Sequence, residues 1–488
     1  MNNRKKLISG VILISMFASL AVGCGSPSEG ENPTDGDNPT DVGTASSTVE
    51  VTDNSTEDEL PDKDYDGYEF RIFTRANDWY RGEWLCESTG DVLDDAIYDR
   101  NAMIAERFNI TFSEETSDNT DTARNTILAG DDAYDVINTR CAIAWTYAEE
   151  GLLVPVDELP YVDLSKAYWD KNINECLTIG NEMYFAVGAN NLTGYDYTHV
   201  LVFNKDMVND NKLDNPYELV DSGAWTFEKY ESMVKGITSD INGDSVMDGN
   251  DIYGYLSQPK AVLPAFWIAA GVQSINKDEN NYPVFTMPSD QKFISIFEQV
   301  YRMTWDNNSW FSNQSRTNYD DLLINMFQNE QALFMDITFF YIASLRDMDA
   351  DFGIIPYPKY DEEQENYYSR IEGCELTCVL VTAGDLERTS IILEALACES
   401  YKSVVPAYYE IALKTKYTRD EDSSRMLDII FENRIFDLGD TIWCTELRDG
   451  VFEGMFMNND RALSSKFASM QTTMDEKLAK TIEAFTED

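Results

Sequence analysis

The sequence predicts an α/β protein with two domains. From residue 68 onward, stretches with strand-like alternation and stretches with helical spacing follow one another, which is typical of a doubly wound, mainly parallel sheet. The part able to fold is about 420 residues long, and a single hydrophobic core does not grow to that size. No internal repeat is visible. Two domains built from unlike segments are therefore expected.

The expected elements alternate in order along the chain. Val92, Ile97 and Ile104 recur at helical spacing and predict a helix over 92–107, and Thr226 is a typical first residue of a helix. Strands are expected at 68–74, 110–112, 134–137, 200–204, 332–335 and 352–356. Further helices are expected at 121–129, 226–235 and 289–305, and the pattern is helical almost throughout from residue 385.

The first residues have the features of an export signal. A cationic end at 4–6, an apolar run at 7–20 and small residues at 21–23 precede Cys24. This arrangement resembles a bacterial lipoprotein signal, in which residues 1–23 are removed and Cys24 becomes the lipid-bearing first residue. Ala21 stands where leucine is usual, and an ordinary signal peptide with a chance cysteine is the alternative. We expect a protein held on the outer face of the cell membrane by its lipid anchor.

A polar, acidic segment follows the cysteine. Between residues 25 and 60 the chain has no Lys or Arg and almost no large apolar side chain. Such a composition cannot bury enough surface to offset the entropy of ordering. Residues 24–64 are therefore expected to form a disordered tether.

The net charge of −51 limits the partners. It excludes nucleic acid and argues against adsorption to anionic lipid head groups. It also disfavours strongly anionic ligands, unless local basic groups such as Arg75 and Arg140 override the field. The alternative is that the acidity only keeps the protein soluble.

The residues needed for common catalytic and metal sites are scarce. His199 is the single histidine, and the cysteines form no CxxC or Cys/His cluster, so zinc sites and histidine-assisted nucleophiles are not expected. A glycosidase needs two carboxylates, but 88 acidic residues supply candidates without selecting a pair. We expect a protein that is not an enzyme, with His199 in a structural role.

Several short stretches occur in a recognisable order. They are DVI at 135–137 with GLLVP at 151–155, VFNKDM at 202–207, AWTFEKY at 224–230, QNEQALFM at 328–335 and DFGIIPYP at 351–358. Together they resemble the oligosaccharide-binding branch (family 1) of the extracellular solute-binding proteins of bacterial ABC importers. Glu330 occupies a position that is often glycine in that family, and the region after residue 403 is longer than in its shortest members.

The resemblance implies a two-lobed, periplasmic-binding-protein-like fold with a hinge and a ligand cleft between the lobes. The N-terminal lobe would comprise 65–195 plus 332–373, and the C-terminal lobe 196–331 plus 374–488, with crossings near 188–199, 329–335 and 372–377. The expected function is capture of a neutral oligosaccharide by a monomer, for delivery to the permease subunits of an ABC importer. A cell-surface glycoside hydrolase and an adhesion or structural lipoprotein are the alternatives.

Candidate sugar-binding residues are those at strand ends and crossings. Flat rings stack on sugar faces, and carboxylates, amides and arginines bind hydroxyl groups. The candidates are Arg75, Asp78, Trp79, Arg140, Trp145, Asn190, Asp196, Trp267, Asp336 and Phe339. Trp267 comes from the segment that, by the resemblance, contributes a stacking ring from the second lobe. Burial of the tryptophans, and surface salt bridges of Arg140 and Asp336, are the alternatives.

One acidic loop has the spacing of an EF-hand calcium site. Oxygen ligands stand at positions 1, 3, 5, 9 and 12, with the Val246 carbonyl at position 7; the side chains are Asp240, Asn242, Asp244, Asp248 and Asp251. Ser245 replaces the preferred glycine at position 6, and Asp replaces Glu at position 12. We expect a structural Ca²⁺ here, with a plain acidic turn as the alternative.

Overall fold

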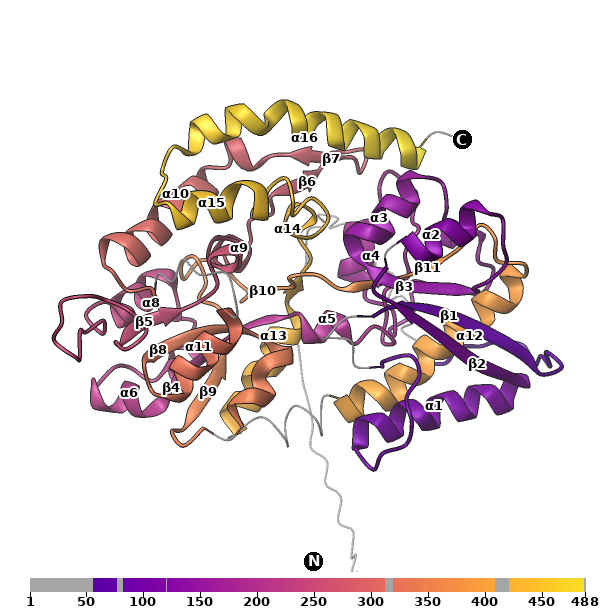
Figure 1. The fold of residues 1–488 in the computed structure, drawn as a ribbon, viewed down its shortest axis with the longest axis horizontal. Helices are drawn as coiled ribbons and strands as arrows, with labels where there is room; N and C mark the ends of the chain where they lie inside the picture. Colours follow the sequence, from indigo (N-terminus) through magenta and orange to yellow (C-terminus); the bar gives the residue numbers. More distant parts are fainter. Residues whose placement is uncertain are drawn as a thin grey trace, which may run out of the picture. The chain divides into compact units, whose positions relative to one another are not determined.

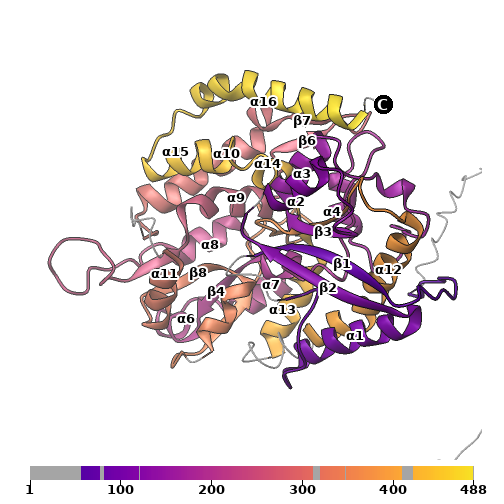
Figure 2. The ribbon, with the colours of Figure 1, turned by 45° about the vertical axis from the view of Figure 1, so that its right-hand side comes forward.

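The computed structural model describes residues 56–76, 82–119, 121–311, 319–346, 348–408 and 421–486. All of them belong to one compact unit, Thr52–Asp488. Its elements form two lobes, each around a four-stranded sheet with helices on both faces (Figures 1 and 2). No helix among these residues has the length and apolar character needed to cross a membrane.

The first sheet is mainly parallel. Its order is β11-β3-β1-β2, with β1 parallel to both β2 and β3, and β11 antiparallel to β3. Phe70 and Ile72 pack on the helices α1 and α12, and Phe73 faces α2 and α3 on the other side. The bounds are β1 Tyr68–Arg75, β2 Ile110–Ser117, β3 Val136–Arg140, β11 Glu375–Val379, α1 Val92–Phe108, α2 Asp121–Leu128, α3 Cys141–Glu149 and α12 Leu386–Glu399.

The second sheet is mixed. Its order is β5-β8-β4-β9, with β4 antiparallel to β8 and β9, and β5 parallel to β8. Val200 and Val202 pack toward α11 and α13, while Leu201 and Phe203 face the cluster that includes α8 and α9. The bounds are β4 His199–Asn204, β5 Tyr253–Leu256, β8 Ala332–Thr338, β9 Phe352–Ile355, α8 Phe227–Val234, α9 Pro259–Ala269, α11 Tyr319–Gln328 and α13 Glu421–Glu432.

Shorter elements surround the two sheets. Two-stranded pairs form from β6 with β7 and from β10 with β12. The bounds are β6 Ile275–Lys277, β7 Pro283–Phe285, β10 Ser369–Arg370, β12 Arg434–Ile435, α4 Lys171–Leu177, α5 Thr193–Asp196, α6 Lys205–Asp210, α7 Pro216–Asp221, α10 Gln291–Tyr301, α14 Leu438–Thr441, α15 Glu453–Met457 and α16 Leu463–Thr486.

The last helix, α16, connects the two lobes (Figure 1). Phe467 near its start packs on Phe285 of β7, and Phe485 at its end packs on Trp145 of α3. Both contacts are aromatic and buried, so the long C-terminal region holds the lobes together.

Side-chain caps fix where several helices begin. The Asp91, Asp170 and Asp385 carboxylates accept hydrogen bonds from backbone N–H groups in the first turns of α1, α4 and α12. The Thr226 hydroxyl accepts from Lys229 N at 3.3 Å, which confirms Thr226 as the start of a helix.

The folded part of the chain begins closer to the N-terminus than expected. Residues 56–64 were assigned to the tether, but Asp58 bonds the Arg107 guanidinium at 2.5 and 3.1 Å and Lys63 bonds Glu387 at 2.9 Å. Arg107 of α1 thus neutralises Asp58, and Lys63 of the segment pairs with Glu387 of α12. The folded unit therefore includes residues that composition alone places in a spacer.

Two parts of the expected lobe assignment are wrong. The segment 332–373 was placed in the N-terminal lobe, but β8 and β9 pair with β4 in the second sheet. Conversely, β11 and α12 were placed in the C-terminal lobe, but β11 pairs with β3 in the first sheet. The segment 329–335 joins α11 to β8 within one lobe and is not a crossing, whereas 188–199 and 372–377 do connect the two sheets.

Candidate functional site

Two arginines lie where parallel strands of the first sheet end. Arg75 is the last residue of β1 and Arg140 the last of β3, and β11 begins at Glu375 directly opposite Arg140. Arg75 Nη1 lies 3.7 Å from Glu375 Oε1. Ligands of α/β sheets bind beyond the carboxyl ends of the strands. These three residues therefore lie where a ligand of the first lobe would bind.

Glu375 is a poorly satisfied carboxyl group. It is 2% exposed, and its Oε2 finds no hydrogen-bond partner among the described residues. Burial raises its pKa to about 7 against the opposing charges of Arg75 and Arg140. Two guanidinium groups thus lie near one buried carboxyl group at this end of the sheet.

A polar layer joins the first crossing to the sheet. The Asn191 amide donates to Asn138 Oδ1 and to Thr377 Oγ1, both at 3.0 Å, and so ties the crossing to β3 and β11. Glu83 accepts from Asn138 Nδ2 at 2.9 Å and from Thr193 N at 3.0 Å. Burial, with the nearby Glu375 and Asp196 charges, raises the pKa of Glu83 to about 8.

The structure brings two predicted hinge residues into this crossing. Asp196 is 1% exposed and accepts a hydrogen bond from the Tyr408 hydroxyl at 2.8 Å. Asn190 is also 1% exposed, and neither atom of its amide has a hydrogen-bond partner among the described residues. A buried amide without hydrogen bonds costs free energy. Among the predicted site residues, Asn190 is therefore the one whose side chain most lacks a hydrogen-bond partner.

A second charged cluster lies on the β4–β8 side. His199 Nδ1 is 2.8 Å from Asp336 Oδ1, and His199 Nε2 is 3.1 Å from Glu372 Oε2. Lys260 Nζ donates to Glu372 at 2.6 Å, and the Ser257 hydroxyl donates to Asp336 at 2.9 Å. Predicted residue Asp336 thus belongs to a network that sequence reasoning did not assemble.

Electrostatics favour the charged forms in this cluster. Burial and Arg370, whose Nη1 lies 2.7 Å from His199 Nε2, act to lower the pKa of His199, but Asp336 and Glu372 together raise it. Burial acts to raise the pKa of Glu372, but Lys260, His199 and Arg370 hold it well below its usual range. The cluster therefore carries paired opposite charges.

These groups border a cavity of about 40 Å³. That volume accommodates a water molecule or a single polar group. Its lining includes Tyr197, His199, Lys260, Asp336, Tyr341 and Glu372. The lining comes from β4, α9, β8 and the second crossing, so this cavity is where the second sheet and the hinge meet.

An ion-pair network lies behind the cavity. Arg370 is fully buried and donates to Asp440 through Nε at 2.6 Å and Nη2 at 3.1 Å. Arg448 Nη1 donates to the Asp440 carbonyl at 2.9 Å and to Asp440 Oδ1 at 3.4 Å. Two guanidinium groups thus bond Asp440, and Arg370 ties α14 to β10.

Both described candidate tryptophans are core residues. Trp145 is 2% exposed; its ring stacks on Phe185 at 5.6 Å and an interplanar angle of 14°, and its Nε1 donates to Thr481. Trp267 is 0% exposed and packs against Phe293 and Phe452. Protein atoms cover both rings, so both tryptophans are packing residues and neither ring is free to stack on a ligand.

The remaining candidates are placed differently. Phe339 is 1% exposed and packs on Phe431 with ring centroids 5.3 Å apart, which makes it part of the second lobe's core. Asp78 and Trp79, expected beside Arg75, lie outside the described residues.

Glu375, Glu372 and Lys260 were missed by sequence reasoning. The signal for the two glutamates was available, because both lie in the crossing expected at 372–377 and a charged side chain there does not serve core packing. Lys260 carried no comparable signal.

The acidic loop has part of the geometry of a calcium loop. Ser245, at position 6, adopts φ of +66°, the left-handed conformation for which EF-hand loops use glycine. Asp240 accepts from Gly243 N and Ser245 N, and Asp251 accepts from Ile241 N and Asp248 N. The backbone turn fits the ion, but within the described residues the carboxylates of this loop are not gathered into a metal-sized cluster.

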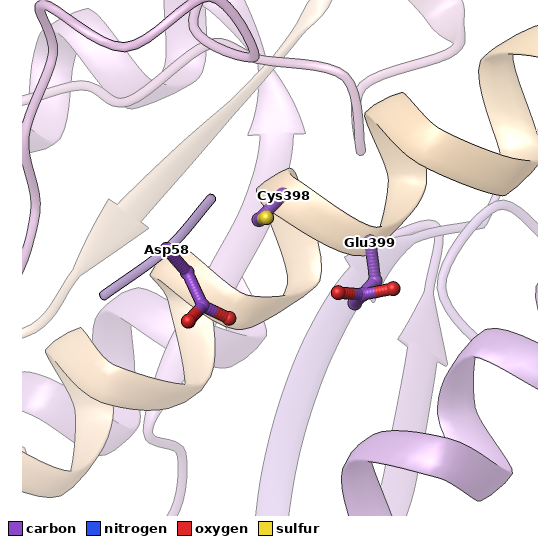
Figure 3. Close-up of side chains that lie close together, drawn as sticks. All are labelled: Asp58, Cys398 and Glu399. Atoms are coloured by element: carbon purple, nitrogen blue, oxygen red, sulfur yellow. The ribbon is translucent and has the colours of Figure 1, made fainter. Parts of the chain in front are cut away.

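A group of three possible metal ligands lies elsewhere (Figure 3). Ligand atoms of Asp58, Cys398 and Glu399 lie within 4.8 Å of one another. Arg107 already pairs with Asp58 and Lys402 pairs with Glu399 at 3.2 Å. Side-chain cations balance these carboxylates, so the group anchors the N-terminal segment on α12 without needing a metal. All seven described cysteines are free thiols.

Comparisons with known proteins give structural matches only. No family model matches the chain, and no curated protein matches it in sequence. A cyclo/maltodextrin-binding protein complexed with maltotetraose superposes with a TM-score of 0.59 at 11% identity, over 84% of this chain and 97% of that one. The chain has the solute-binding-protein fold.

Two further matches have the same fold. An ABC substrate-binding protein from Listeria monocytogenes in complex with cycloalternan gives a TM-score of 0.55 at 13% identity, covering 85% of this chain and all of the other. UspC of M. tuberculosis gives 0.55 at 14% identity, with 85% and 100% covered. The two-lobed α/β architecture expected from the sequence is thereby confirmed.

Proposed function

We propose that this protein is the substrate-binding component of an ABC importer and takes a carbohydrate between its lobes. The observation that carries the proposal is the fold: solute-binding proteins complexed with maltotetraose and cycloalternan superpose over 84–85% of this chain and nearly their full length. The polar residues gathered at both crossings support it, because such groups bind sugar hydroxyls.

Binding without turnover is the expected behaviour. Thermal unfolding of the chain from Thr52 onward, which forms one compact unit, is measured with a panel of oligosaccharides. A rise in Tm that grows with ligand concentration supports a receptor. No shift with any carbohydrate contradicts it, and release of shorter sugars identifies a glycoside hydrolase instead.

We further propose that Cys24 carries a lipid that holds the protein, as a monomer, at the outer face of the cell membrane near the permease. The export-signal pattern of residues 1–24 supports this. Mass spectrometry of the membrane-extracted protein tests it: an acylated N-terminal Cys24 is expected, and a chain that begins elsewhere without lipid contradicts it.

A structural Ca²⁺ in the loop 240–251 is a separate proposal. The ligand spacing and the left-handed Ser245 support it. Asp240, Asn242, Asp244, the Val246 carbonyl, Asp248 and Asp251 would hold the ion. Added Ca²⁺ is expected to raise Tm in the wild type and not in Asp244→Asn combined with Asp248→Asn; equal response of both proteins contradicts the site.

A further inference from the structure

Arg140 is unusual among the arginines of this acidic protein. Even exposed arginines pair with carboxylates, as Arg302 does with Glu231 and Arg461 with Asp306. Arg140 is exposed, and within the described residues no carboxylate lies within 4.0 Å of its guanidinium; its contact is Cys444 Sγ at 3.8 Å. In a chain with 88 acidic and 37 basic residues, an arginine with no carboxylate partner among the described residues needs an explanation.

The position of Arg140 supplies one. β1 and β3 are parallel neighbours, with Thr74 opposite Asn138, so Arg75 and Arg140 end adjacent strands at the same edge. Glu375, at the start of the neighbouring strand β11 and opposite Arg140, has Oε1 3.7 Å from Arg75 Nη1. Two guanidinium groups thus share one carboxyl group whose pKa is raised to about 7 by burial.

Three carboxylates near the second crossing are each paired with a cation. Glu372 is bonded by Lys260, Asp336 by His199, and Asp440 by Arg370. Two further buried carboxyl groups, Glu83 and Asp196, bond to neutral groups and not to Arg140. An arginine without a described carboxylate within ion-pair distance therefore lies at the carboxyl edge of the first sheet, where ligands of such sheets bind.

We propose that the ligand is an anionic carbohydrate, one bearing a carboxylate or sulfate group that Arg140 binds with the help of Arg75. This rests on the proposed receptor function and replaces the expectation of a neutral sugar. A planar guanidinium binds a carboxylate through two parallel N–H···O bonds. The large negative charge of the rest of the protein then makes a local cationic site necessary for such a ligand.

The test compares matched ligands by isothermal titration. Oligogalacturonates and sulfated galactan oligosaccharides are titrated against methyl-esterified oligogalacturonates and neutral galacto-, malto- and xylo-oligosaccharides. At least one anionic series is expected to bind at least tenfold more tightly than its neutral counterpart, with an affinity that falls as salt rises. The carboxylated and sulfated arms identify which anion is bound.

Variants assign the effect to Arg140. Arg140→Gln is expected to lower the affinity for the anionic ligand at least tenfold and to reduce its salt dependence, while leaving Tm unchanged. Arg140→Lys should recover part of the affinity, since it keeps the charge and loses the bidentate geometry. Arg302→Gln, which removes a surface arginine paired with Glu231, is the matched control and should bind as the wild type does.

Three results overturn the proposal. Neutral sugars that bind as tightly as anionic ones refute it and leave the receptor function intact. Unchanged affinity of Arg140→Gln for an anionic ligand refutes the role of the arginine. No binding of any carbohydrate refutes both this proposal and the proposed function.

Discussion

Replacing Asp440 by Asn should destabilise the protein through the charge it leaves behind. Arg370 and Asp440 are both fully buried and joined by two hydrogen bonds, at 2.6 and 3.1 Å. Removing one partner of a buried ion pair costs about 3–5 kcal/mol, because the other charge stays buried. Among carboxylates, Arg370 would keep only the longer 3.9 Å contact with Glu372, so most of this cost is expected. Arg448, which also contacts the Asp440 carboxylate, loses that charged partner at the same time.

The loss converts into a measurable shift of Tm. Unfolding entropy of about 2.1 cal/mol/K per residue gives roughly 0.9 kcal/mol/K for a unit of about 430 residues. Asp440→Asn should then lower Tm by about 3–6 °C in scanning calorimetry. Asp221→Asn is the control: it breaks an exposed ion pair with Arg425, 48% and 42% exposed, and should cost less than about 1 kcal/mol.

A double variant separates the two parts of this reasoning. Adding Arg370→Met to Asp440→Asn removes the uncompensated charge and should recover part of the lost Tm. A loss in Asp440→Asn no larger than that in Asp221→Asn, or no recovery in the double variant, would refute the role assigned to the buried charge.

Three further predictions concern stability and its pH dependence. Because the pKa of His199 is raised, the stability it contributes is complete below its ordinary pKa and is lost as pH rises through the raised value. The Tm of the wild type should therefore exceed that of His199→Gln by less at pH 9 than at pH 6. A constant difference in Tm would contradict the pairing with Asp336. Glu83 has a pKa raised to about 8, so ionising it costs stability as pH rises from about 4.5. The difference in Tm between Glu83→Gln and the wild type should therefore favour the variant more at pH 9 than at pH 5. The opposite trend would be inconsistent with a neutral buried carboxyl group. Trp145→Ala should cost about 3–5 kcal/mol by leaving a core cavity, seen as a lower Tm in the absence of sugar; an unchanged Tm would mean that Trp145 is not a packing residue.

The local elements were predictable because their signals are local. Alternation over 68–74 and helical spacing over 92–107 gave strand β1 and helix α1 nearly to the residue, and Thr226 marked a helix start through its own hydroxyl. Periodicity and capping depend on residues a few positions apart, which the sequence displays directly.

The lobe assignment failed because strand pairing is not local. Ala332–Thr338 could join either sheet by its apolar composition, and its antiparallel pairing with β4, in which Leu201 lies opposite Asp336, places it in the second sheet. Likewise, Glu375–Val379 is a buried strand whose partner, β3, lies more than 200 residues earlier in the chain. Neither pairing leaves a mark in the strand's own residues.

Site residues were predicted where their position at the end of a strand identifies them. They were chosen wrongly where burial by distant segments determines whether a ligand can reach them. Arg75 and Arg140 were found because they end strands, and Asp336 because it follows a run of apolar residues. Trp145 and Trp267 were chosen by residue type, but exposure depends on Phe185, Phe485, Phe293 and Phe452, which the fold brings from distant segments.

Native mass spectrometry of the chain from Thr52 onward, incubated with mixed neutral and anionic oligosaccharides, shows whether the protein binds a carbohydrate without cleaving it. We expect a one-to-one complex with a single intact carbohydrate, which dissociates to unchanged protein and unchanged sugar. Absence of any complex, or recovery of only shortened sugars, would contradict a binding component of an importer.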